Sequence, residues 1–111
     1  MMPGMNRSRQ ITAMASEQRL KILQLLAQPQ VHFNQQWSAD PVAFGVCMTL
    51  IAEALDIAQP TASRHLAILK EAGFLTVKKH LKWSYCTRDE AAISEYLQWL
   101  GEHLALQVRG R

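Results

Sequence analysis

A connection of only four residues, from Asp56 to Gln59, separates two helical patterns and constrains the fold more than any other feature of the sequence. Before it, residues 46–55 place most of their apolar side chains on one side of a helix. After it, Pro60 suits the first turn of a second helix, which stops at Gly73. Two helices joined by so short a turn, the second opening in small polar residues, indicate a helix-turn-helix over residues 46–73.

Three further helices are expected, two before this motif and one after it. Apolar spacing predicts a short helix over residues 5–15, a second from Ser16 to near Pro29, and a last one over residues 89–107. Ser16 and the acidic residues at the start of the last helix are typical of helix N-termini.

Between the helix-turn-helix and the last helix, residues 74–79 and 82–87 have the composition of two strands with a polar tip between them. The expected fold is therefore mainly α with a small β-hairpin, an α+β arrangement in the order α-α-α-α-β-β-α. The 111 residues suffice for one compact core, so residues 1–111 are expected to form a single domain.

Several classes of protein are excluded by what the sequence lacks. It has no run of about 18 apolar residues and no apolar stretch behind its N-terminal arginines, so we expect neither a membrane span nor a secretory signal. Two cysteines are too few for a disulfide scaffold, which favours a reducing cytoplasm. No nucleophile with a neighbouring base, paired carboxylates or phosphate-binding glycine loop is found, so no enzymatic activity and no cofactor are predicted.

Positive charge is concentrated in one part of the chain. Residues 57–88 carry a net charge of +5, whereas the remaining residues sum to −2. A basic segment inside a slightly acidic domain suits a surface that faces phosphates, because each neutralised phosphate releases counterions. A solvated lysine face would give the same pattern, so charge alone does not decide between them.

The opening of the second helix supplies the side chains that DNA recognition requires. Short polar side chains there can approach base edges and phosphates closely, and an arginine can bind guanine or phosphate. The hairpin adds lysines that would reach the flanking backbone or the minor groove. The predicted DNA contacts are Gln59, Thr61, Ser63, Arg64, His65, Lys78, Lys79 and Lys82.

Four segments of the sequence resemble those of the ArsR/SmtB winged-helix repressors, namely residues 19–26, 47–55, 57–66 and 71–74. The resemblance covers most of residues 16–100, and its most specific part is the run Gln-x-Thr-x-Ser-x-His-Leu that starts at Gln59. It implies a winged helix-turn-helix fold, with residues 74–87 as the wing. Leu81 stands where such proteins commonly have glycine, so we expect a looser turn than a two-residue hairpin with positive φ.

The resemblance also implies a homodimer that binds double-stranded operator DNA and releases it when an effector binds. The dimer would be assembled largely through the helices at residues 5–15 and 89–107. Independently of the resemblance, residues 1–10 are expected to form a flexible arm. A stripe of apolar residues fits such a two-fold face, although burial in the chain's own core would explain it too. The predicted interface residues are Ile11, Ile93, Tyr96, Leu97, Leu100 and Leu104.

The metal sites of this family are matched poorly. Cys47 aligns with the first cysteine of the family's soft-metal pair, but Thr49 replaces the second, so no metal site is predicted. Thiol oxidation, or a metal or metalloid at Cys47, is the alternative signal. A half-buried structural role is the default for Cys47 and Cys86, which are not expected to meet within one subunit.

The connection over residues 28–44 is unusually long and carries aromatic bulk. It could cover an effector pocket, extend the dimer contact or fill a hydrophobic gap. The leading hypothesis is a dimeric transcriptional repressor with an unknown small effector. The alternative is a winged-helix module whose basic face binds an acidic protein without sequence-specific DNA binding.

Overall fold

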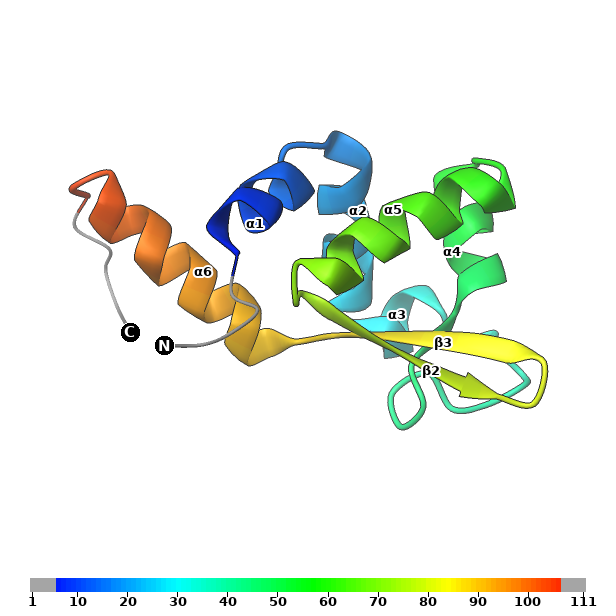
Figure 1. Ribbon diagram of the computed structural model, residues 1–111. Helices are drawn as coiled ribbons and strands as arrows, with labels where there is room; N and C mark the ends of the chain where they lie inside the picture. The colour runs from blue at the N-terminus through cyan, green and yellow to red at the C-terminus, as the bar shows by residue number, and fades with distance from the viewer. Residues whose placement is uncertain (1–5, 107–111) are drawn as a thin grey trace.

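The computed structural model describes residues 6–106, and its elements run in the order helix, helix, short helix, strand, helix, helix, hairpin, helix (Figure 1). The β-hairpin and the last helix project in opposite directions from the helical body. The elements are α1 (Arg7–Met14), α2 (Glu17–Leu26), α3 (Pro29–His32), β1 (Val46–Cys47), α4 (Met48–Leu55), α5 (Gln59–Glu71), β2 (Leu75–His80), β3 (Trp83–Arg88) and α6 (Glu90–His103).

Side-chain caps begin three of the helices where the sequence places short polar residues. Asn6, Ser16 and Asp89 each accept a hydrogen bond from the backbone N–H of the third residue of the helix that follows. Residues 7–10 are therefore helical, which corrects the expectation of an arm over residues 1–10; its first five residues lie outside the described part. The last helix ends at His103, before the expected end at residue 107, a residue that is outside the described part of the chain.

The turn of the helix-turn-helix is closed by a left-handed residue. Asp56 has φ +56°, and the amide of Ile57 donates to the carbonyl of Ala52 at 3.1 Å. This bond satisfies a carbonyl at the end of α4 and redirects the chain into α5 after three residues. The prediction of two helices joined by a tight turn is confirmed.

The hydrophobic core lies between the helices and the inner face of the sheet. Its largest fully buried side chains include the aromatic residues Phe33 and Phe74; Tyr85 is equally buried, but on the other face of the sheet beneath the long connection. Leu66 and Leu69 of α5 lie in it beside Ile22 of α2, so burial of one face fixes which face of α5 points outward. Phe33 fills the core from the long connection.

The sheet has three strands rather than two, in the order β1–β3–β2, all antiparallel. Val46 and Cys47, expected to begin a helix, instead form β1, and α4 begins only at Met48. Gly45 enters β1 with φ +103°, and a Cβ there would lie 2.8 Å from the carbonyl oxygen of Cys86. Close approach of two backbones therefore requires glycine at this position.

The wing ends in a two-residue turn, which contradicts the expected looser one. His80 pairs with Trp83, leaving Leu81 and Lys82 as the turn. Leu81 takes φ +58°, a conformation that disfavours any residue with a Cβ, and its side chain is 83% exposed.

The long connection packs against the wing and β1. The buried side chain of Gln36 accepts from the amide of Cys47 at 2.7 Å and donates to the carbonyls of Ala39 and Gly45. The hydroxyl of Tyr85 donates to Ser38 at 2.9 Å. Residues 33–45 therefore support the outer side of the sheet, and the short helix α3 occupies part of the connection.

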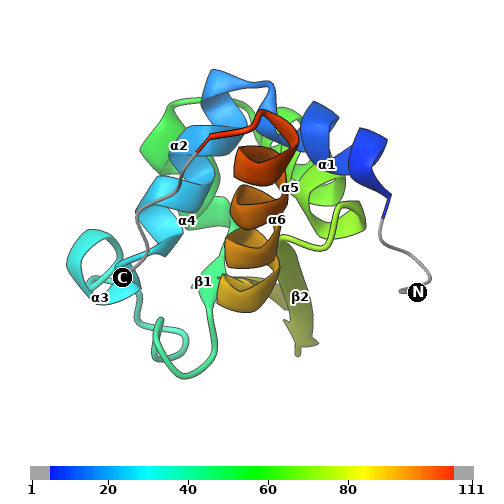
Figure 2. The same ribbon diagram turned by 90° about the vertical axis from the view of Figure 1, so that its left-hand side faces the viewer.

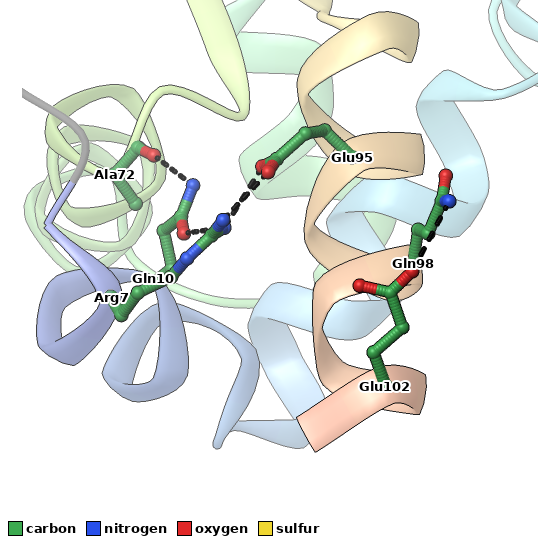
Figure 3. Close-up of polar contacts among 6 residues, drawn as sticks. All are labelled: Arg7, Gln10, Ala72, Glu95, Gln98 and Glu102. Atoms are coloured by element: carbon green, nitrogen blue, oxygen red, sulfur yellow. Dashed lines mark hydrogen bonds and ion pairs between the residues drawn. The ribbon is translucent and has the colours of Figure 1, made fainter. Parts of the chain in front are cut away.

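Helix α6 stands in front of the body when the molecule is viewed from its side (Figure 2). The guanidinium of Arg7 on α1 donates to both carboxylate oxygens of Glu95, at 2.8 and 2.6 Å (Figure 3). It also lies 4.6 Å from the ring centre of Trp99. Gln10 donates to the carbonyl of Ala72 at the end of α5. Helix α1 thus connects α6 to α5.

Two of the expected interface residues are buried within the chain. Ile93 is 8% exposed and Tyr96 is 3% exposed, the latter packing edge-on against Phe74. They contribute to the chain's own core and offer almost no surface to a second copy, which corrects the expectation for both. Leu97 and Leu104 are more than half exposed.

No described helix is long and apolar enough to cross a membrane.

The side chain of Arg19, 8% exposed, joins three helices. From α2 it donates to the carbonyls of Thr12 and Ala13 at the end of α1, both at 2.9 Å, and contacts Nδ1 of His65 on α5 at 3.0 Å. No carboxylate pairs with it among the described residues. The carbonyls at the C-terminal, negative end of α1 supply the compensation instead.

Replacing Arg19 with methionine (R19M) should lower the free energy of unfolding by about 2–4 kcal/mol, because the buried carbonyl of Ala13 would lose its donor and that of Thr12 would keep only the amide of Ala15. Urea unfolding at one protein concentration measures the change. Lys21→Met, an exposed position on the same helix, should change it by less than about 0.5 kcal/mol. Equal stability of both variants would show that the Arg19 contacts contribute nothing.

Candidate nucleic-acid interface

Helix α5 presents a polar face opposite its buried one. Ala62, Leu66 and Leu69 are buried, whereas most of the predicted contacts on this helix lie at the surface. Thr61 and His65 are half-buried, and Gln59, Ser63 and Arg64 are exposed. The 3.6-residue period brings these side chains to the outer surface of one helix, as recognition of base edges requires.

The N-terminus of α5 has no side-chain cap. Ala58 occupies the capping position, and Pro60 follows within the first turn. The amide of Thr61 therefore meets no capping side chain, and the positive end of the helix dipole faces the surface next to Gln59. Both features favour an anion such as a DNA phosphate.

The three lysines of the wing are exposed, and two of them are supported by aromatic rings. The ammonium of Lys78 lies 5.2 Å from the ring centre of Phe44, and that of Lys82 lies 5.3 Å from Trp83. Phe44 also packs edge-on against Tyr85. A cation resting on a ring face keeps its charge at the surface while its stem is held, so Lys78 and Lys82 are partly preorganised.

A shallow groove of about 190 Å³ separates α5 from the wing. Ser63 and Lys70 of α5 line one side, and Val77 and Ser84 of the sheet line the other. Lys70 is a cation that the predicted contacts omitted; its distance of seven residues from Ser63, two helical turns, would have placed it on the same face. Arg88 is turned away from this surface, because it donates to the carbonyl of Leu23 and to both carboxylate oxygens of Glu90.

His65 differs from the other predicted contacts because it already has an internal partner. An arginine only donates, so the contact with Arg19 makes Nδ1 of His65 the acceptor and leaves the proton on Nε2. Burial, and then the charges of Arg19 and Arg64, lower the pKa of His65 below 6.5. Only Nε2–H is left for a partner outside the chain.

The two cysteines do not form a pair. The strand register places Val46 opposite Cys86 and Cys47 opposite Tyr85, so the two thiols point to opposite faces of the sheet and line different cavities. Burial, with a contribution from Cys47, raises the pKa of Cys86 to about 12, which keeps it a thiol. Among residues 6–106, no three His, Cys, Asp or Glu side chains converge on a metal position.

Comparisons with known proteins agree with this geometry. A family model described as a helix-turn-helix domain matches residues 14–78. An uncharacterized HTH-type transcriptional regulator of Bacillus subtilis, YbzH, is 39% identical over 88 residues, which cover 79% of this chain and 88% of that protein. The arsenical resistance operon repressor of Escherichia coli is 47% identical over a shorter stretch of 38 residues, 34% of this chain and 32% of that protein.

The fold is also found among solved structures. A homodimeric winged helix-turn-helix DNA-binding domain from Mycobacterium bovis, described as a possible ArsR-family transcriptional regulator, superposes with a TM-score of 0.63 at 23% identity. The superposition covers 95% of this chain and 85% of that one. Helices with a small antiparallel sheet in this order define the winged helix-turn-helix class, which confirms the expected fold. The chain belongs to the ArsR family of winged helix-turn-helix transcriptional regulators, which are not enzymes.

The lowered pKa of His65 predicts a pH dependence of stability. The unfolded chain binds this proton more readily than the folded one, so the contribution of His65 is complete above about pH 6.5 and is lost as the pH falls toward the lower pKa of the folded state. Urea unfolding of the wild type and of His65→Gln, whose amide oxygen can still accept from Arg19, measures the difference between about pH 7.5 and 5. The variant should lose less stability on acidification; parallel losses would contradict the prediction.

Proposed function

We propose that this protein is a homodimeric repressor that binds a double-stranded operator through α5 and the wing and releases it in response to a signal. The observation that carries the proposal is the polar, uncapped start of α5 together with three exposed lysines on the hairpin whose first strand packs against that helix. An acidic protein partner would need the lysines but not the short polar side chains at the start of the helix.

Within this interface the residues divide into two roles. Gln59, Ser63 and Arg64 lie on the outer face of α5, where side chains enter the major groove and read base edges. Lys78, Lys79 and Lys82 would contact phosphates or the minor groove, which adds affinity with little sequence discrimination. Thr61 would bind a phosphate with its hydroxyl and its amide at the uncapped helix end.

The apolar surface of α1 and α6 supports a dimer. Ile11 is 47% exposed, Leu97 54% and Leu104 56%, while Leu100 is half-buried beside the core. Leu97 and Leu104 are seven residues apart and so lie on one side of α6, which would pack on its two-fold copy, and Ile11 lies on α1. The Mycobacterium bovis domain of similar fold is described as homodimeric. A two-fold dimer would read two half-sites related by approximate dyad symmetry.

The direction of regulation is proposed from a relative. The Escherichia coli protein that shares the 38-residue stretch is named an operon repressor. Repression follows physically where an operator overlaps the promoter, because the bound dimer excludes the polymerase. The buried Cys47 and the raised pKa of Cys86 give no support to thiol oxidation as the releasing signal.

Arg64→Ala should weaken operator binding by about 1–3 kcal/mol, roughly fivefold to more than a hundredfold in Kd. Fluorescence anisotropy with the DNA upstream of the protein's own gene, at two salt concentrations, measures the change against a scrambled fragment. Lys21→Ala, which also removes an exposed cation but lies on α2, is the matched control. Sequence-blind binding by the wild type would favour the alternative of a protein-interaction module.

Leu97→Glu should convert the dimer to a monomer, because the substitution would bury a carboxylate in an apolar two-fold contact. Sedimentation velocity measures the mass in solution. Leu81→Glu places the same charge on an equally apolar but distant side chain at the wing tip, and this variant should remain dimeric. A wild-type chain that sediments as a monomer would overturn the proposed assembly.

A further inference from the structure

A second cavity, of about 250 Å³, lies outside the proposed DNA interface, between the long connection and the helix-turn-helix. Trp37 from the connection and Trp83 from the wing form part of its wall. Thr49, Leu50 and Glu53 contribute the side formed by α4, and Cys47 lies at its inner end. The cavity therefore touches the connection, the first helix of the helix-turn-helix and the wing.

The two tryptophans form adjacent walls. Their ring centres are 6.2 Å apart and their planes meet at 85°. Trp37 is 84% exposed, so this large apolar ring is held at the surface beside an open cavity instead of being buried. Indole faces at right angles offer a cation two electron-rich surfaces, and indole is the best of the aromatic side chains for this contact.

The charge of the cavity points to the same kind of ligand. Among residues 6–106, Glu53 is the one carboxylate that lines it, and no cation of these residues lies at ion-pair distance from it. Lys82 shows that the Trp83 ring accepts a cation, because its ammonium rests 5.3 Å from the ring centre. The remaining polar groups are partly occupied: Gln36 bonds to the backbone and Ser38 accepts from Tyr85.

We propose that this cavity binds a small organic cation with an apolar body, a protonated or quaternary amine bearing an aromatic or short alkyl group. The ammonium would lie between the indoles and Glu53, and the apolar body would contact Leu50. The cavity is smaller than the sites that hold drug-sized molecules, which restricts the ligand to a compact one.

Occupancy would lower affinity for the operator, a step that rests on the proposed function. A ligand in this cavity presses on α4, which packs against α5, and on Trp83 of the wing. A ligand cation on the Trp83 ring would also repel the ammonium of Lys82, one of the proposed phosphate contacts, which lies 5.3 Å from the centre of that ring. By linkage, the operator would weaken ligand binding by the same factor.

The test of binding uses the full chain without DNA. Titration with benzyltrimethylammonium, followed by the indole N–H signals in ¹H–¹⁵N correlation spectra, should shift Trp37 and Trp83 and leave Trp99, on α6, unchanged as an internal control. Benzyl alcohol and phenylacetate are the neutral and anionic probes of similar shape. Equal binding of phenylacetate would overturn the proposal. Shifts of the Trp37 and Trp83 signals that depend on protein concentration in the absence of any probe would also overturn it, because they would show that a second copy covers Trp37.

Two variants identify the groups responsible. Glu53→Gln should weaken binding of benzyltrimethylammonium on the order of fivefold, and Trp37→Ala should weaken it at least as much. Both side chains are exposed, so the fold should be retained, as circular dichroism would show. Glu17→Gln removes an exposed carboxylate at the start of α2 and should bind the probe like the wild type. Unchanged affinity in Glu53→Gln would overturn the assignment.

The regulatory step has its own readout. Saturating benzyltrimethylammonium should raise the operator Kd of the wild type severalfold and leave that of Trp37→Ala unchanged. If the probe binds but the operator Kd does not change, the regulatory step is wrong while the ligand site stands. If the chain binds no specific DNA although the indole signals shift, the proposed function fails separately.

Discussion

The buried guanidinium of Arg19 is the interaction on which the arrangement of the helices depends. A buried charge without a carboxylate partner persists only where polar groups replace water, and here two carbonyls at the end of α1 and the Nδ1 atom of His65 do so. These three acceptors belong to helices α1 and α5, while Arg19 belongs to α2. The geometry of these contacts therefore sets the orientation of α5 relative to α1 and α2.

Helix α1 also fixes the position of α6. Its C-terminal carbonyls hold Arg19, and its first residue, Arg7, holds Glu95 (Figure 3). The helix proposed to read DNA and the helix proposed to form the dimer thus share one rigid intermediary. Because the spacing of two recognition helices in a dimer must match the helical repeat of DNA, a fixed angle between α5 and α6 is a requirement for operator binding.

Local patterns predicted the part of the fold that short-range physics determines. The period of α5, its proline start, the tight turn at Asp56 and the paired wing strands all follow from neighbouring residues. Strand β1 was missed because two residues carry no periodicity, and its pairing partner, Cys86, lies 40 positions away in the chain. The burial of Tyr96 escaped prediction for a related reason, since an apolar stripe does not tell whether Phe74 or a second chain covers it.

The long connection stabilises the wing. A two-stranded hairpin alone is only marginally stable in water, and a strained Leu81 at its tip weakens it further. Strand β1 adds a third strand, Gln36 satisfies the backbone beside it, and Phe44 packs on Tyr85 and beneath Lys78. The position of the wing lysines relative to α5 therefore depends on residues 33–45, and a ligand that moves this segment would move the wing with it.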